Sequence, residues 1–313
     1  MIKKDKLIED KDQKNDFTEK KEDDFDKKSV KQTTCVQLNL FSWQTEQLAK
    51  GWRCIAGFNF IEAEEVFLTV LGQDTNNDEA TLALKIVLYW KENFERCSEM
   101  GDLEKMQFIF EKWEKFSFPK TWGAKLFSNA LLQEIISIAK RLNIFYINNN
   151  ITIADLYLFA EKTEYAEQEM LNFLKTNERS ASVLWHLANL QWILDKKLEA
   201  KQNYLKAILI NPDEIQIEKT ENKALAAIIK KYGTEMTPAW GWIHSQLPII
   251  EFKENECGET TKRGLYAYYL LSMAETLDKQ RNFKQIINYR KLLKENEPEL
   301  YDAYFAILKK RKV

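Results

Sequence analysis

The spacing of apolar and small residues across residues 181–214 constrains the fold of this chain more than any other feature of its sequence. In an α-helix, residues at i, i+3, i+4 and i+7 lie on one face. Four residues of this stretch have that spacing: Leu184, Leu187, Ala188 and Gln191. The first half of the stretch is therefore predicted to form an amphipathic helix.

A second helix is predicted after a short polar connection. Ala200, Tyr204 and Ala207 repeat the helical spacing, and residues 195–197 read Asp-Lys-Lys between the two sets. A connection this short favours antiparallel neighbours. Pro212 then ends the second helix, because proline cannot donate a backbone hydrogen bond. The whole stretch predicts a helical hairpin.

This hairpin resembles a tetratricopeptide repeat, a unit of about 34 residues made of two helices. The family fills certain positions with large apolar, small and aromatic residues and a final proline, and here they are held by Leu184, Leu187, Ala188, Gln191, Ala200, Tyr204, Ala207 and Pro212. Only Gln191 departs from the family pattern. The resemblance implies an all-α fold, an irregular right-handed solenoid of αα-hairpins, and a role in binding other proteins.

Weaker copies of the pattern occur elsewhere in the chain. The unit at 147–180 directly precedes the best unit at 181–214 and shares its register through Ile153, Ala154, Tyr157, Ala166, Met170 and Phe173. Less regular units lie near 44–77, 87–120 and 267–300. Their second-helix positions are Ala63, Phe67, Val70, Met106, Phe110, Trp113, Ile286 and Leu293. In a solenoid, each such hairpin buries its apolar face against the next.

Composition agrees with a helical fold. The chain has nine Gly and five Pro, too few for a turn-rich β architecture, and 45% of its residues are hydrophobic. Residues 1–35 differ, because Lys and acidic residues are equally numerous there and aliphatic residues are few. That composition predicts a disordered, charge-balanced tail. The solenoid is expected over residues 36–313, with helices from about Phe41.

Turn-forming residues predict where the helices break. Breaks are expected near residues 73–77, 118–122, 148–150, 212, 233–238 and 254–261. The segment 219–248 fits no repeat. We expect it to pack on the array as a cap or insertion, held by Trp240 and Trp242.

Charge and cysteine content argue against several classes of protein. The net charge of −2 does not suit a nucleic-acid-binding protein, which neutralises phosphates with clustered Lys and Arg. The basic cluster at 309–312 is explained by cations at a helix C-terminus. The N-terminal sequence lacks the apolar run of a secretory signal, and no stretch of about 18 apolar residues could cross a bilayer. Cys35, Cys54, Cys97 and Cys257 show no metal-ligand spacing. We expect a cytoplasmic protein without membrane contact, metal or cofactor.

The resemblance also implies where a partner binds. In this family, peptide or protein ligands lie on the concave face formed by the first helices. The side chains carried over to that groove are Ser182, Trp185, Asn189, Trp192, Ile193, Asp155, Phe159 and Trp52. Aromatic side chains dominate binding energies, so Trp185 and Trp192 of the best repeat suit such a groove. The alternative is that a C-terminal helix folds back and buries Trp185 and Trp192. Trp185 stands where the chaperone-binding members need a Lys, which argues against that specialisation.

A short motif at the end of the predicted tail suggests a second class of function. Gln37, Leu38, Leu40 and Phe41 resemble the pentapeptide with which bacterial replication and repair proteins dock on the sliding clamp. Two Leu and one Phe suit an apolar groove. The alternative is that these residues begin the first helix and pack on the array. The motif leaves open a replication-associated adaptor.

A catalytic role has little support in the sequence. The chain has two histidines, His186 and His244, and none of the common hydrolase, metalloprotease or phosphate-binding motifs. His186 suits an ordinary helix position. His244 follows Trp240 and Trp242 closely enough that an aromatic-lined pocket is conceivable. An enzyme on a helical scaffold is therefore the third hypothesis, and no catalytic residue is predicted.

Overall fold

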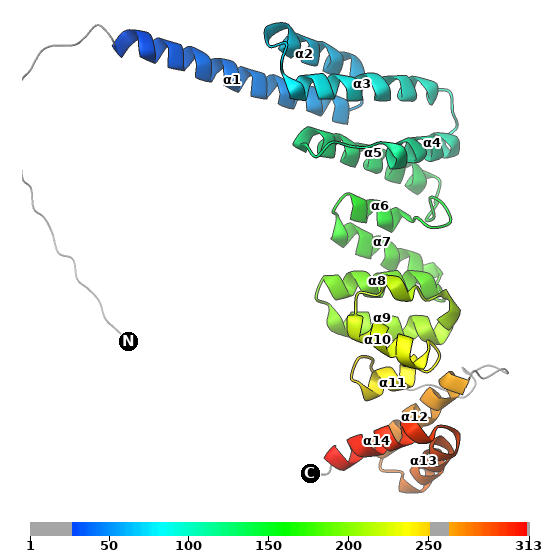
Figure 1. Cartoon of the computed structure of the whole chain (residues 1–313). Helices are drawn as coiled ribbons and strands as arrows, with labels where there is room; N and C mark the ends of the chain where they lie inside the picture. Colours follow the sequence, from blue (N-terminus) through cyan, green and yellow to red (C-terminus); the bar gives the residue numbers. More distant parts are fainter. Residues whose placement is uncertain (1–26, 251–262, 312–313) are drawn as a thin grey trace, which may run out of the picture. The chain divides into compact units, whose positions relative to one another are not determined.

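The computed structural model of the chain describes residues 27–250 and 263–311, with backbone only up to residue 41 (Figure 1). These residues form fourteen α-helices and contain no β-strand, apart from one isolated bridge between Tyr146 and Thr152. The predicted all-α class is confirmed.

The helices have the following bounds, with two short 3-10 turns, η1 and η2, between α9 and α10: α1 (Lys27–Ala56), α2 (Phe60–Gln73), α3 (Asp78–Arg96), α4 (Asp102–Lys115), α5 (Trp122–Arg141), α6 (Ile153–Phe159), α7 (Thr163–Thr176), α8 (Ala181–Ile193), α9 (Lys197–Ile210), η1 (Pro212–Glu214), η2 (Ile217–Lys219), α10 (Lys223–Tyr232), α11 (Thr237–Ile243), α12 (Arg263–Lys279), α13 (Phe283–Asn296) and α14 (Pro298–Arg311).

The helix bounds fit most of the predicted breaks. Gaps between helices fall at residues 74–77, 116–121 and 142–152, at 211 and at 233–236, close to the expected turn residues. The first helix differs, because α1 begins at Lys27 rather than near Phe41 and so includes the last part of the predicted tail. Residues 1–26 and 251–262 lie outside the described residues, and with them the rest of that tail and most of the break at 254–261.

The chain divides into two compact units. Unit 1 comprises residues 1–95 and 121–127, and unit 2 comprises residues 96–120 and 128–313. In unit 1, α1 packs on α2. The buried Trp52 lies edge-on to Phe67, with ring centroids 5.7 Å apart. A Cβ atom on Gly123 would lie 2.0 Å from the Trp52 ring, so a glycine is needed at this close approach.

Six helix ends in the described residues share one backbone geometry. In each, a residue other than glycine has φ between 55° and 61°. Its N–H donates to the carbonyl three residues back, and the next N–H donates to the carbonyl five residues before itself. These bonds satisfy carbonyls that the helix leaves open, as in a Schellman-type cap. The six left-handed residues are Phe58, Asn143, Glu161, Asp195, Ser245 and Arg281.

Four of these helix ends are hairpin turns of the same length. After Phe58, Glu161, Asp195 and Arg281, the next helix begins two residues later, and that helix has 14 residues each time. The hairpins are α1–α2, α6–α7, α8–α9 and α12–α13, and the two helices of each pair contact one another. Three of them belong to unit 2.

The second helices of these hairpins bury the residues that the sequence pattern selected. The fourth residue of each helix is Ala63, Ala166, Ala200 or Ile286, and all four are buried. One turn later lie the buried Phe67, Met170 and Tyr204. The alanines at 63, 166 and 200 are small and let the paired helices approach closely. The predicted inward-facing residues of these helices are confirmed, except that Phe173 is half-buried.

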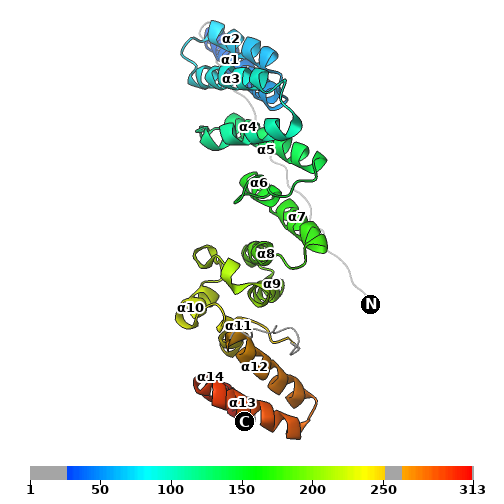
Figure 2. The same ribbon diagram turned by 90° about the vertical axis from the view of Figure 1, so that its right-hand side faces the viewer.

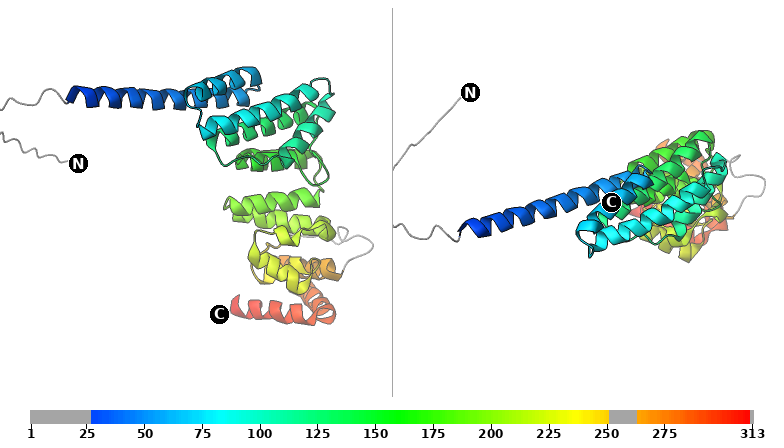
Figure 3. Two further views of the ribbon diagram at one scale, coloured as in Figure 1. Left: turned by 45° about the horizontal axis from the view of Figure 1, so that its top comes forward. Right: turned by 90° about the horizontal axis from the view of Figure 1, so that it is seen from above.

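The helices of unit 2 from α6 to α9 follow one another in chain order (Figures 1 and 3). Neighbouring helices contact each other from α6 through α9, and again from α10 through α14. Figure 2 shows α13 and α14 side by side at the C-terminal end of the unit. Helix α11 also contacts both α9 and α14, which come from distant parts of the sequence. The segment at 219–248 thus packs on its neighbours, as predicted.

Gln191, which departs from the family pattern, joins three helices by hydrogen bonds. Its Nε2 donates to Glu167 Oε1 on α7 at 3.1 Å, and its Oε1 accepts from Asn203 Nδ2 on α9 at 2.8 Å. Lys196 Nζ donates to the second Glu167 oxygen at 2.5 Å. Gln191 and Glu167 are both buried. A buried carboxylate needs such partners, so the amide serves where an apolar residue could not.

The shared turn geometry predicts opposite effects of glycine at two nearby positions. Arg281→Gly is expected to raise the free energy of unfolding by up to about 1 kcal/mol, because it relieves the left-handed backbone of a residue with a Cβ. Lys291→Gly, which removes another exposed cation within α13, is expected to lower it by about 1 kcal/mol. Urea denaturation followed by circular dichroism measures both. A loss of stability in both variants would contradict the assignment of Arg281 as a strained helix end.

The hydrogen-bond chain through Gln191 yields a second stability prediction. Gln191→Leu is expected to lower the free energy of unfolding by about 1–3 kcal/mol, because the buried Glu167 loses a donor and Asn203 loses an acceptor. Gln168→Leu, at an exposed amide on α7, serves as the control and is expected to change it by less than about 0.5 kcal/mol. The same urea titration compares them. Equal midpoints for the two variants would refute the structural role of Gln191.

Candidate functional site

Trp185, the central residue of the predicted groove, is buried in unit 2. Only 1% of its surface is exposed, and its ring lies edge-on to Tyr204 with centroids 4.6 Å apart. Both side chains belong to a core cluster that continues into α10, α11, α12 and α14. Trp185 therefore stabilises the packing of α8 on α9, and the prediction that it is an exposed ligand contact is corrected.

The side-chain oxygen of Asn189 also forms hydrogen bonds within the chain. Its Oδ1 accepts a hydrogen bond from the Tyr204 hydroxyl at 2.5 Å and another from the backbone N–H of Glu221 at 3.0 Å. Burial raises the pKa of the Tyr204 hydroxyl, which keeps it protonated as a donor. The amide oxygen of Asn189 thus holds α9 and the segment after η2 against α8.

The segment from η1 to Glu221 covers this part of α8. Turn η1 contacts both α8 and α9. Further along, Gln216 forms a side-chain hydrogen bond with His186, and the charges of Lys219 and of Asp155 on α6 also act on that imidazole. The alternative from the sequence was that a C-terminal helix buries Trp185. Trp185 is buried, but the segment that covers α8 lies between α9 and α10.

The other predicted groove residues on α8 are more accessible. Ser182 is half-buried. Trp192 is partly exposed, with the Lys197 ammonium 4.3 Å from its ring centroid. Ile193 is 63% exposed at the end of the helix. These last two lie at the α8–α9 turn, away from the covered stretch.

The remaining predicted groove residues lie on α6 and α1. Asp155 caps its own helix in a capping box with Thr152, accepting from the Thr152 N–H at 2.8 Å. Phe159 is 48% exposed and packs beside Trp113 at 5.4 Å between ring centroids. Trp52 is fully buried in unit 1, and its indole N–H donates to Glu79 at 2.9 Å. Of the eight predicted residues, Trp185 and Trp52 are thus buried, whereas Phe159 and Ile193 are exposed.

The predicted clamp-docking motif lies within helix α1 of unit 1. Residues 37–41 have a helical backbone there, but the helix begins at Lys27, whereas the alternative expected it to begin at this motif. The side chains of Gln37, Leu38, Leu40 and Phe41 lie outside the described residues. Clamp docking stays a prediction.

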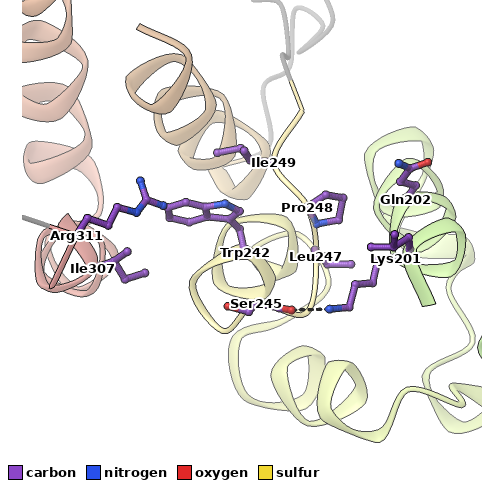
Figure 4. A pocket seen from close by; sticks show the side chains of 10 residues that line it. Lys201, Gln202, Trp242, Ser245, Leu247, Pro248, Ile249, Ile307 and Arg311 are labelled. Carbon is purple, nitrogen blue, oxygen red and sulfur yellow. Dashed lines mark hydrogen bonds between the residues drawn. The ribbon is translucent and has the colours of Figure 1, made fainter. Parts of the chain in front are cut away.

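A pocket of about 350 Å³ lies in unit 2 where α9, α11 and α14 meet (Figure 4). Its walls are mainly apolar and its polar groups come from α9, the α11 end and α14. The lining residues are Leu198, Lys201, Gln202, Trp242, Ser245, Leu247, Pro248, Ile249, Ile307 and Arg311. Two of them were singled out from the sequence: Trp242, and Arg311 as part of the basic cluster at 309–312.

The end of α11 shapes one wall of this pocket. Helix α11 ends at the left-handed Ser245, and the chain then turns back so that Leu247 packs on Gly241. A Cβ atom on Gly241 would lie 2.7 Å from a Leu247 methyl carbon, so glycine permits this contact. The residues that follow Leu247 are held against α12, because the Ile250 N–H donates to the Tyr268 hydroxyl at 3.1 Å. The wall is therefore held by several elements.

Two cations stand at opposite sides of the pocket (Figure 4). Arg311 lies over the Trp242 ring at 5.5 Å, and its Nη1 donates to the Glu275 carboxylate at 2.9 and 3.1 Å. Lys201 Nζ donates to the backbone carbonyl of Ser245 at 2.7 Å. The lining contains no carboxylate. The positive charge of Arg311 is thus paired, whereas Lys201 has a neutral partner.

The pocket was missed because its walls come from separate parts of the sequence. One signal was present: Leu198 is an apolar residue outside the buried spacing of α9, and it is 76% exposed. A single exposed Leu is common on protein surfaces, so Leu198 indicates a contact surface only together with the apolar pocket walls beside it. The other lining residues gave no local pattern, because α11 and α14 fit the repeat poorly.

Among the described residues, no group of three or more His, Cys, Asp or Glu side chains could hold a metal ion. Within the same residues, every helix is too short or too polar to pass through a bilayer. Comparison of the chain with protein-family models, with curated proteins and with solved structures found no match. The resemblance to tetratricopeptide repeats stays a prediction.

His186 is expected to make stability depend on pH. Burial is the main cause that lowers the pKa of His186 below its ordinary value of 6.5, and the nearby Lys219 acts in the same direction. The attraction of Asp155 and the hydrogen bond of Gln216 oppose this shift. The unfolded chain therefore binds a proton more readily than the folded chain. Stability should be highest above pH 6.5 and should fall as the pH drops below that value.

Comparing wild type with His186→Gln tests this dependence. Urea midpoints measured between pH 8 and pH 5.5 should fall for wild type and fall less for the variant, which has no titrating group at this position. Both proteins should still lose stability at lower pH, where carboxylates titrate. Parallel curves between pH 8 and pH 5.5 would show that His186 has no such effect.

Proposed function

We propose that this chain is a helical-repeat scaffold that binds a peptide or protein segment. Its four hairpin turns of equal geometry and its 14-residue second helices support a tetratricopeptide-like arrangement. Repeats of this kind stack into a right-handed solenoid, and we propose that architecture for the helices of unit 2. The role is binding without catalysis.

We place the contact surface at the pocket between α9, α11 and α14. The observation that carries this choice is the coexistence of an open apolar side chain, Leu198, with apolar pocket walls. Contiguous exposed apolar surface beside polar groups is typical of interaction sites. The predicted α8 surface is less suitable, because Trp185 is buried and Asn189 is already bonded.

We also propose that the protein acts in the cytoplasm. Neither Cys54 nor Cys97 forms a disulfide in the part of the chain that the structure describes. Burial raises the pKa of each thiol, which keeps it in the less reactive protonated form. Buried thiols of this kind suit a reducing compartment.

Selection from a displayed library of random 12-residue peptides tests the binding role. The whole chain is immobilised, and an enriched peptide is expected to bind it in solution. Leu198→Asp should weaken binding of that peptide about tenfold or more, because a carboxylate replaces an apolar contact, a loss of about 1.4 kcal/mol.

Leu103→Asp is the matched control. Leu103 is 48% exposed and, like Leu198, is the second residue of a 14-residue helix in unit 2. This variant should bind the peptide as wild type does. Absence of any enriched peptide, or equal weakening by the two substitutions, would contradict the proposal. Circular dichroism confirms that both variants remain helical.

A further inference from the structure

We propose that the pocket between α9, α11 and α14 recognises an acidic peptide segment, in which an Asp or Glu side chain adjoins an apolar one. This inference rests on the proposed binding function and names the class of ligand. It follows from the charge of the lining, the exposure of its apolar wall and the arrangement of its polar groups.

The charge of the lining favours an anion. Lys201 and Arg311 are the charged residues among the ten that line the pocket. The guanidinium of Arg311 is compensated by Glu275, whose side chain is 5% exposed on α12. The Lys201 ammonium donates to the carbonyl of Ser245, which carries no net charge. A ligand carboxylate would therefore give Lys201 the ion pair that its own surroundings lack.

The apolar part of the lining favours a neighbouring apolar side chain. Leu198 is 76% exposed and Leu247 is 3% exposed, and both line the pocket. Pro248, Ile249 and Ile307 add further apolar surface. Covering an exposed Leu and these walls removes apolar area from water, which supplies binding free energy that an ion pair at a surface does not.

The polar groups of the lining suit a peptide backbone. Gln202 is exposed beside Lys201 on α9, and its amide can both donate and accept a hydrogen bond. Ser245 is exposed on the opposite wall. Figure 4 shows Gln202 and Lys201 on one side of the pocket and Trp242 with Arg311 on the other. The volume of about 350 Å³ is near the lower end of the roughly 300–1,000 Å³ of ligand pockets, which fits a short segment.

The peptide enriched in the display selection is the probe for this proposal. It is expected to contain Asp or Glu beside an apolar residue. A second peptide carries Asn or Gln at every acidic position and is otherwise identical. Fluorescence polarisation of the labelled peptides on the whole chain should show at least tenfold weaker binding of the amide peptide. Raising the salt concentration should weaken the acidic peptide more than the amide one.

A pair of charge reversals on α9 locates the interaction. Lys201→Glu is expected to weaken the acidic peptide about tenfold or more, and to change binding of the amide peptide by less than about threefold. Lys206→Glu makes the same change of charge on an exposed side chain of the same helix that does not line the pocket. It should change binding of either peptide by less than about threefold, since an exposed charge away from the pocket is screened.

The outcomes separate the two proposals. An enriched peptide that lacks acidic residues, or that binds equally as acid and amide, overturns the ligand class and leaves the binding function standing. Equal weakening by Lys201→Glu and Lys206→Glu also overturns it, because a general charge effect then explains the result. Failure to enrich any peptide overturns both. Thermal unfolding of each variant shows that the fold is intact, so weakened binding is not a folding defect.

Discussion

The left-handed residue at the end of the first helix in each hairpin is the constraint on which unit 2 depends. A residue with φ near 60° reverses the chain within two residues, and the two backbone bonds across the turn fix the direction of the next helix. None of the four hairpin turns uses glycine at this position, so each accepts some backbone strain. The packing of the 14-residue second helices offsets that strain, because each buries apolar side chains.

The left-handed turn also determines which side chains lie near the helix ends. Glu161 and Asp195 are left-handed residues 34 positions apart, which is the repeat length of the family that the chain resembles. Gln191 and Lys196, on either side of the second turn, both bond to Glu167 of the preceding hairpin. The turn thus connects two hairpins as well as two helices. Beyond Asp195, it also presents Leu198 at the edge of the pocket, where the side chain lies outside the buried spacing of α9.

Periodicity in the sequence predicted the helices because burial follows it directly. Ala200 and Tyr204 are buried as their spacing requires, and the same holds for Ala166 and Met170. The candidate site could not be predicted in the same way. Trp185 has the position of a ligand contact in the family, yet it is buried in a core cluster to which α9 to α14 contribute, and no local pattern of the sequence indicates that packing. Gln191 likewise looked like a defect, because its partners Glu167 and Asn203 come from other helices.

The polar bonds around α8 explain why a partner contacts the edge of the unit in the proposed function. A ligand on the covered part of α8 would have to displace the segment bearing Gln216 and Glu221. That displacement would break the hydrogen bond from the Glu221 N–H to Asn189 Oδ1 and leave the Tyr204 hydroxyl as its donor, and one such bond contributes about 0.5–1.5 kcal/mol. At the pocket the situation is reversed. Leu198 is already exposed, and Lys201 has no anionic partner there, so an acidic segment gains contacts without breaking any. Binding of an acidic segment is therefore most favourable at the pocket, where Leu198 is exposed and Lys201 donates only to a neutral carbonyl.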